Sequence, residues 1–402
     1  MKKIFFGCAI TAVVLLASCR KDEAFTEINS QPQVSEIEKF LSETNPTARA
    51  VAEEITSMGL SLEDVSFVSG VIEEAVQEGY DEYSSFDYLI SDEGGQRNKK
   101  GQKEFARKFF EQIKKSQRFS SRSEDDVLDI LKGENVSLYW PNAEDWDGTT
   151  MPAIAIVNEK DIIEDAEEEG RAIPAFELDS RGRIKDTIMI TAQFVDERPI
   201  WLIGNRPKSD IQVLKPSSLG GNIVPGISEL GSIATVSLGK FQATRYYDPW
   251  TKGGPEFVIS TSYPFVSKDP NTGLYKANDR QTKVCIQLTR KDVKYDRIKT
   301  YNTVIVPEWQ AGVNEMGFEI YEDDTDLIDK TKEVKLTFSY KGFSFQTSFF
   351  LGHSDDDIYS TTYSRDFIRS AANYNNGDWQ WHHCDGVHWT LPYTKNNIVV
   401  PR

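Results

Sequence analysis

The chain has 402 residues, 63 of them acidic and 46 basic, and its formal net charge at pH 7 is −17. A surface this negative repels nucleic acids and anionic lipid headgroups, so both are poor partners, and divalent cations are the more natural small ligands. Hydrophobic residues make up 39% of the chain and aromatic residues 11%, which is enough to build hydrophobic cores in two or three domains.

The first eighteen residues have the pattern of a secretory signal. Lys2 and Lys3 precede an apolar run that ends at Leu16, and this run is too short to span a bilayer, because a spanning helix needs ~20 apolar residues. The run leads into Leu16-Ala17-Ser18-Cys19, which resembles the lipobox of bacterial lipoproteins. The resemblance implies cleavage before Cys19 and lipidation of its thiol. The alternative is an ordinary secretory signal that contains a chance cysteine.

The residues that follow the lipobox predict the destination of the chain. No aspartate follows Cys19 directly, and an aspartate there retains many lipoproteins at the inner membrane. Lys21-Asp22-Glu23 resembles the surface-export signal of some Gram-negative lipoproteins. We therefore expect an outer membrane lipoprotein at the cell surface, held in the membrane by its lipid, since each buried methylene contributes ~0.8 kcal/mol. Residues 19–34 are polar and aperiodic, and we expect them to form a tether.

Residues 35–132 have the pattern of a small helical domain with about four helices. Apolar residues recur at intervals of three and four, which is typical of helices that bury one face. Ser61 with Asp64, and Ser123 with Asp126, have the spacing of capping boxes and predict the starts of two of these helices.

After Gly133 the pattern changes to short runs of β-branched and aromatic residues that turn residues separate. We expect a β-rich domain over residues 133–215, a linker over residues 216–235, and an antiparallel β-sandwich over residues 236–352. Residues 353–402 form a C-terminal segment rich in aromatic residues and histidine. The predicted fold class is therefore a multidomain α+β protein, with a helical domain followed by two β-rich domains.

A cluster of carboxylates follows one predicted strand of the sandwich. Glu322, Asp324 and Asp326 alternate along the chain, and alternate side chains of an extended segment project in the same direction. Asp329 closes this segment from its far side. Carboxylate oxygens are the ligands that calcium prefers, so the cluster predicts a calcium site. The alternative is a solvated surface loop on a very acidic protein.

The motifs of about residues 240–350 resemble the calcium- and phospholipid-binding β-sandwich of protein kinase C and synaptotagmin. In order, they are Asp248-Pro249-Trp250, Pro307-Glu308-Trp309 and the acidic cluster. The resemblance implies calcium ligands at Asp248, Glu322, Asp324 and Asp329. The chain departs from the family pattern where Glu322 replaces the usual aspartate and where Lys330 replaces the usual glycine.

The C-terminal segment offers a second kind of binding site. Trp379 and Trp381 are expected on one face of a strand, where tryptophan rings can stack on sugars, although a packing role is more common for tryptophan. His382-His383-Cys384 and His388 are transition-metal ligand types. Adjacent histidines on a strand point to opposite faces, however, so histidines packed among aromatic residues are the favoured interpretation.

Cys285 and Cys384 are the cysteines that lie outside the signal region. Outside the cytoplasm they could form a disulfide, and the alternative is two separate thiols. The chain has no nucleophile elbow, zinc-protease motif, phosphate loop or dinucleotide fingerprint. We therefore expect a lipid-anchored binding or structural protein with a calcium-binding sandwich, rather than an enzyme. The alternatives are a glycan-binding lipoprotein of a nutrient-uptake system, with a glycan or protein ligand, and a hydrolase without a recognisable motif.

Overall fold

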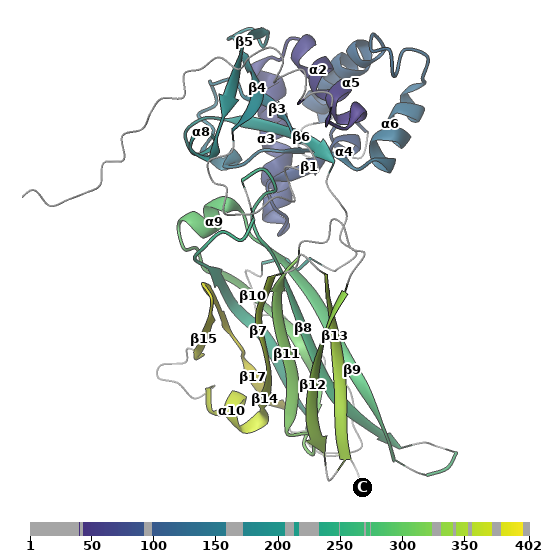
Figure 1. Cartoon of the computed structure of the whole chain (residues 1–402), viewed down its shortest axis with the longest axis vertical. Helices are drawn as coiled ribbons and strands as arrows, with labels where there is room; N and C mark the ends of the chain where they lie inside the picture. The colour runs from purple at the N-terminus through teal and green to yellow at the C-terminus, as the bar shows by residue number, and fades with distance from the viewer. Residues whose placement is uncertain are drawn as a thin grey trace, which may run out of the picture.

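Two domains lie one above the other along the long axis of the molecule (Figure 1). The computed structural model describes residue 40 and residues 43–91, 99–157, 172–205, 213–216, 233–248, 250–268, 271–273, 275–323, 331–340, 343–352, 356–371 and 379–396. The expected multidomain α+β class is confirmed. None of the helices in these ranges combines the length and the apolar composition that crossing a membrane requires.

The N-terminal domain contains one mixed sheet and most of the helices. The helices are α2 (Pro46–Ser57), α3 (Leu62–Gln77), α4 (Phe86–Ile90), α5 (Lys99–Ile113), α6 (Glu124–Gly133), the 3-10 helix η1 (Ala143–Asp145) and α8 (Ala192–Glu197). The strands are β1 (Tyr83–Ser85), β2 (Val136–Tyr139), β3 (Ala153–Ile156), β4 (Ile173–Leu178), β5 (Ile184–Ile190) and β6 (Ile200–Asn205). They pair in the order β1-β2-β6-β3-β4-β5, and within this sheet β3 and β6 run parallel.

The capping boxes predicted from the sequence are confirmed at the starts of α3 and α6. Ser61 accepts from the backbone N–H of Asp64, whose carboxylate accepts from the backbone of Ser61 at 2.8 Å. Ser123 and Asp126 make the same reciprocal pair before α6. Each box satisfies backbone N–H groups that the first turn of a helix leaves without a partner.

The sheet of the N-terminal domain buries both of its faces, because successive residues of a strand point to opposite sides. On β3, Ile154 and Ile156 join the core beneath the helices, whereas Ala153 and Ala155 join a second cluster on the opposite face. The first core contains residues from α2 through β6, so helices and sheet share one hydrophobic interior. Residues on both sides of Gly133, where the sequence predicts the change from helices to strands, therefore contribute to the same hydrophobic core.

One turn of the sheet sets the position of the connection between α2 and α3. Gly182, in the turn between β4 and β5, has a φ of +66°, and a Cβ there would lie 2.0 Å from the carbonyl oxygen of Leu60. We expect Gly182→Ala to lower the free energy of unfolding by about 2–4 kcal/mol. The alanine would strain the left-handed backbone conformation, and its Cβ would also clash with the carbonyl of Leu60. Urea denaturation measures this loss.

A second glycine provides the control for this prediction. Gly148 also has a positive φ, of +76°, but a Cβ there would meet nothing within 4 Å. Gly148→Ala should therefore lower the free energy of unfolding by only about 1 kcal/mol, which is the cost of the left-handed backbone conformation without a clash. Equal losses in the two variants would contradict the close approach of the turn to Leu60.

The C-terminal domain is a sandwich of two antiparallel sheets. One sheet has the order β10-β7-β16-β15, with β17 also paired to β7, and the other has the order β14-β11-β8-β9. The strands are β7 (Ile233–Ala243), β8 (Glu256–Lys268), β9 (Tyr275–Gln287), β10 (Lys299–Gln310), β11 (Glu315–Glu322), β14 (Asp356–Ser364), β15 (Trp381–Cys384), β16 (Val387–Thr390) and β17 (Tyr393–Asn396). A hairpin of β12 (Thr331–Tyr340) and β13 (Phe343–Gly352), and the helices α9 (Arg290–Lys294) and α10 (Arg365–Ala371), complete it.

The aromatic C-terminal segment is part of this sandwich. β14 pairs with β11, and β16 and β17 pair with β7. Trp389 and Leu391 are buried in the core between the two sheets. Residues that follow position 352, where the sequence predicts the end of the sandwich, therefore supply strands to both sheets.

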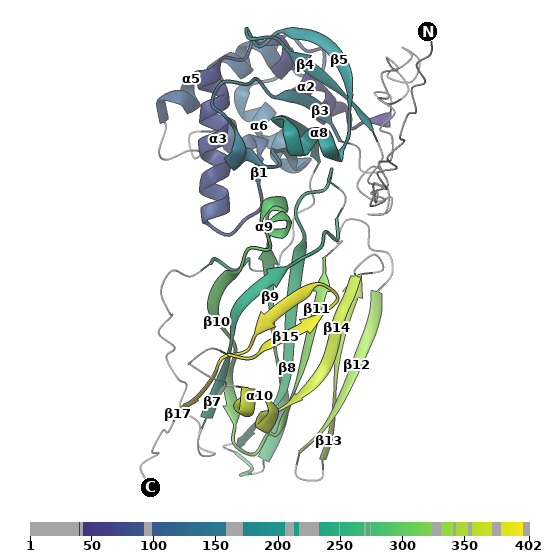
Figure 2. The same cartoon turned by 90° about the vertical axis from the view of Figure 1, so that its left-hand side faces the viewer.

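The two domains meet at α9 and at the loop before β8 (Figure 2). Trp250 of this loop is 4% exposed and joins the second cluster of the N-terminal domain. Lys291 of α9 forms ion pairs with Asp145 and Glu144, and Arg297 donates to Glu144 at 2.8 Å. An apolar anchor and complementary charges therefore hold the domains together.

Candidate functional site

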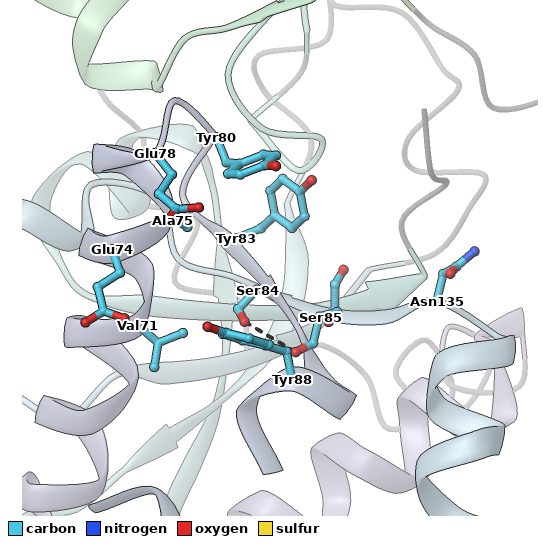
Figure 3. Close-up of a pocket in the computed structure, with 11 residues that line it drawn as sticks. Val71, Glu74, Ala75, Glu78, Tyr80, Tyr83, Ser84, Ser85, Tyr88 and Asn135 are labelled. Carbon is cyan, nitrogen blue, oxygen red and sulfur yellow. Dashed lines mark hydrogen bonds between the residues drawn. The ribbon is translucent and has the colours of Figure 1, made fainter. Parts of the chain in front are cut away.

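A pocket of about 510 Å³ opens between α3 and β1 of the N-terminal domain. We call it the tyrosine pocket; it is lined by Val71, Glu74, Ala75, Glu78, Tyr80, Tyr83, Ser84, Ser85, Tyr88, Asn135 and Ser137. Figure 3 shows Tyr80 and Tyr83 at one end, Tyr88 at the other, and the residues of α3 along one side. The pocket has the size and mixed polarity typical of small-molecule sites.

Three tyrosine rings give the pocket its aromatic character. Tyr80 and Tyr88 are each 37% exposed, which is unusual for large aromatic side chains, and Tyr83 is half-buried. Tyr83 packs against the second cluster of the N-terminal domain, which holds it in place. Rings at both ends of a cavity offer flat apolar faces, and their hydroxyl groups remain able to form hydrogen bonds.

Polar groups line the floor of the pocket between the rings. The Ser84 hydroxyl donates to the carbonyl of Ser85 at 3.3 Å, and the Ser137 hydroxyl donates to the carbonyl of Gly204 at 3.4 Å. Asn135 adopts a left-handed backbone conformation with a φ of 50° in the turn between α6 and β2. Serine hydroxyl groups therefore lie near the tyrosine rings, and the Asn135 amide lies at the far side of the pocket (Figure 3). This combination suits a ligand with both apolar and hydroxyl-bearing surfaces.

The end of α3 fixes one rim of the pocket. Gly79 has a φ of +92°, and a Cβ there would lie 2.6 Å from the carbonyl oxygen of Leu214. The segment that contains Leu214 is itself tied to the sandwich, where Leu214 donates its N–H to Cys285 at 2.8 Å. Lys215 of this segment lies 3.4 Å from the carboxylate of Glu78. The rim is therefore built from both domains.

A second candidate site lies at the domain junction, where Asp248 and Glu322 share a hydrogen bond. We call these two residues the carboxyl pair; they are 5% and 1% exposed. Lys252 lies 2.9 Å from Asp248, and the backbone N–H of Glu256 donates to Glu322 at 3.3 Å. The loop before β8 thus brings the Asp248 carboxylate and the Lys252 ammonium to the end of β11, and the first residue of β8 adds a backbone N–H donor.

Burial raises the pKa of Glu322 well above its ordinary value, and the negative charge of Asp248 adds to the effect. A protonated Glu322 donates its hydrogen to the Asp248 carboxylate, so one proton and the Lys252 ammonium offset two buried carboxylates. This arrangement can hold a proton, or it can release the proton in exchange for a cation.

The structure places two residues of the predicted calcium site side by side. Asp248 and Glu322, which are 74 positions apart in the sequence, lie in contact. Asp324, Asp326 and Asp329 lie outside the described residues. In the part of the chain that the structure describes, no group of three or more His, Cys, Asp or Glu side chains is arranged to hold a metal ion.

A network of hydrogen bonds connects the carboxyl pair with the tyrosine pocket. Gln287 donates to Glu256 at 2.7 Å and accepts from the backbone N–H of Asp81 at 3.2 Å. The Asp81 carboxylate accepts from the backbone N–H of Gly254 at 3.1 Å. Asp81 directly follows Tyr80, so the segment that supplies the tyrosines also binds the sandwich.

The aromatic tail contains the other predicted site residues. Trp379 precedes β15 and Trp381 begins it, and both side chains are half-buried. His382 stacks on Trp389 with ring centroids 5.8 Å apart, and burial lowers the pKa of His382 to about 4. His383 and His388 contact each other across β15 and β16. The favoured interpretation of His382 as a histidine packed among aromatic residues agrees with this arrangement.

The possible disulfide is not formed. Cys285 is buried on β9, and Cys384 lies on β15 of the other sheet, where its thiol donates to the carbonyl of Ile358. The two strands lie in different sheets of the sandwich, which separates the thiols, so the alternative of two separate thiols holds. Cys19, the predicted lipidation site, lies outside the described residues.

The sequence prediction missed the tyrosine pocket. Residues 80–88 fall within a stretch expected to be helical, but they contain strand β1. A signal for the pocket was nevertheless present, since three tyrosines and two serines occur within these nine positions.

No model of a known protein family matches the chain, and searches of curated proteins and of solved structures find no significant match.

Proposed function

We propose that this chain is a lipid-anchored, cell-surface protein that binds a glycan in the tyrosine pocket. The observation that carries the proposal is a pocket of about 510 Å³ with exposed tyrosine rings at opposite ends, serine hydroxyl groups between them and the Asn135 amide at its far side (Figure 3). A sugar ring has apolar C–H faces that stack on aromatic rings, and hydroxyl groups around its edge that need hydrogen-bond partners. The pocket supplies both kinds of partner.

The alternative location for the same function is the pair Trp379 and Trp381. These residues are half-buried, but they do not line the tyrosine pocket. A pocket removes more of the ligand from water than two isolated rings can, so we favour the tyrosine pocket.

A glycan array followed by calorimetry tests the proposal. Tyr80→Ala and Tyr88→Ala should each weaken binding of an array hit by at least about tenfold, since each removes an aromatic face worth roughly 1.4 kcal/mol. Both rings are 37% exposed, so their removal should leave the melting temperature nearly unchanged.

Matched variants distinguish the tyrosine pocket from other surfaces. Tyr295→Ala removes a ring that is 56% exposed but does not line the pocket, and it should leave affinity unchanged. Trp379→Ala and Trp381→Ala should also bind normally. Loss of binding in the tryptophan variants alone would move the site to the C-terminal tail, and a chain that binds no glycan would refute the proposal.

Calcium binding at the carboxyl pair is the second candidate function. It is supported by the contact between Asp248 and Glu322, because two buried carboxylates are a natural starting point for a site that favours oxygen ligands. The ammonium of Lys252 competes for the same place, at 2.9 Å from Asp248. Calcium would have to displace both the shared proton and this ammonium.

Calorimetry with calcium tests this candidate. If the ion binds, saturation at about 100 times the dissociation constant should stabilise the protein by ~2.7 kcal/mol, and Asp248→Asn should abolish the effect. The absence of both heat and a change in melting temperature at millimolar calcium would exclude it.

A further inference from the structure

The tyrosine pocket is acidic as well as aromatic. Glu74 and Glu78 belong to its lining, and the described lining residues include no lysine, arginine or histidine. The two glutamates are four residues apart along α3, so they lie on one face of the helix about 6 Å apart along its axis. A ligand in the pocket therefore meets two carboxylates from the lining, and the nearest basic group is the Lys215 ammonium that pairs with Glu78 at the rim.

The end of α3 adds to this negative potential. Glu78 is the C-cap residue of the helix, and the last turn contains no basic residue. The C-terminus of a helix carries a partial negative charge, so a glutamate there is placed where a cation would be favoured. The partial charge of the helix end and the two carboxylates therefore both favour a cationic group of the ligand.

An ammonium already occupies the rim. Nζ of Lys215 lies 3.4 Å from the carboxylate of Glu78, and both side chains are more than half exposed. An exposed ion pair of this kind is weak, so a ligand ammonium that also contacts aromatic rings can replace it. Lys215 therefore shows the chemistry that this rim accepts.

We infer that the ligand of the tyrosine pocket carries a free amine and belongs to the class of amino sugars. The inference rests on the proposed glycan binding and specifies its substrate class. The tyrosines stack on the sugar ring, while Glu74 and Glu78 receive the ammonium group beside it. The overall negative charge of the chain, −17, raises the local concentration of such cations.

Oligosaccharides that differ only at the amine provide the test. Glucosamine dimers and trimers carry ammonium groups, and N-acetylglucosamine dimers and trimers have the same rings without the charge. In calorimetry with the full chain, the glucosamine oligomers should bind at least tenfold more tightly. This advantage should shrink as salt increases, because salt screens the attraction between charges.

Charge-neutralising variants distinguish attraction by the carboxylates of the pocket from attraction by the acidic surface as a whole. Glu74→Gln with Glu78→Gln should bring the affinity ratio of the two oligomer series close to one, while binding of the N-acetylated series persists. Glu73→Gln removes the same charge from an exposed position of α3 that does not line the pocket, and it should retain the full preference.

The outcomes distinguish the two proposals. Equal affinity for both series in the unmodified chain would overturn the amine inference and leave glycan binding intact. A preference for glucosamine that survives the double variant would show that the charge of the whole surface causes it, and would also overturn the inference. Failure of both series and of the glycan array would remove the proposed function and the inference together.

Discussion

Replacement of Trp250 by alanine should lower the melting temperature of the N-terminal domain by roughly 10 °C. Trp250 belongs to the sandwich by sequence, but its side chain is 4% exposed and joins the cluster that contains Tyr139, Ile200 and Leu202 of the N-terminal sheet. Truncation of a buried tryptophan to alanine costs about 3–5 kcal/mol, because it removes apolar contacts and leaves a cavity. For a domain of this size each kcal/mol corresponds to about 2–4 °C.

Differential scanning calorimetry measures this effect. We expect the variant to show a separate transition for the N-terminal domain at lower temperature, because loss of the anchor uncouples the two domains. Trp381→Ala is the control, since Trp381 is half-buried and lies outside this cluster. A variant of Trp250 that melts like the unmodified chain would show that the tryptophan is not the anchor between the domains.

The same substitution should also weaken ligand binding. Tyr83 of the tyrosine pocket packs against the cluster that Trp250 completes, so a cavity there loosens the support of the tyrosine ring. The expected effect is a several-fold loss of glycan affinity at a temperature where the variant remains folded. Unchanged affinity would mean that the pocket is held by the N-terminal domain alone.

The second large effect concerns pH and the carboxyl pair. The pKa of Glu322 is raised in the folded protein above its ordinary value of 4.5, chiefly by burial and also by the charge of Asp248. Above pH 4.5 the unfolded chain has lost this proton while the folded chain keeps it. The contribution of Glu322 to stability is therefore fully present below pH 4.5 and declines as pH rises toward the pKa of the folded state.

Glu322→Gln should flatten this decline. Glutamine has the shape of protonated glutamate and cannot ionise, so the variant retains a donor to Asp248 at every pH. Each proton contributes a slope of up to about 1.4 kcal/mol per pH unit, and the difference between variant and unmodified chain should therefore grow as pH rises. Urea denaturation from pH 5 to pH 9 measures it.

Two further residues make this prediction specific. Burial and the charge of Asp81 also raise the pKa of Glu82, so a part of the decline should remain in the variant. Glu63→Gln, on the exposed surface of α3, should leave the slope unchanged. Identical slopes for Glu322→Gln and the unmodified chain would contradict a shared proton between Asp248 and Glu322.

Local structure could be predicted well from the sequence, because short-range patterns encode it. The boxes at Ser61 and Ser123 predicted helix starts correctly, and runs of β-branched and aromatic residues predicted that the chain after Gly133 is rich in strands. β1 was missed because it has only three residues, too few to show a period of two.

The carboxyl pair is an example of a contact between residues that are far apart in the sequence. Motif order linked Asp248 to Glu322, and the fold brings these two side chains together. The pattern did not indicate Lys252, which pairs with Asp248, or Gln287, which connects this site to Asp81. Such partners are selected by the packing of the domain junction rather than by spacing along the chain.

The sequence by itself determined the charge of the protein, most of its strands and helix starts, and its α+β class, because each depends on composition or on neighbours a few residues apart. Only the tertiary structure decided that the helices and the first strands share one core, that Trp250 crosses to the other domain, and that Cys285 and Cys384 lie on separate sheets. Those outcomes depend on which apolar faces bury one another, a choice made by packing over the whole chain.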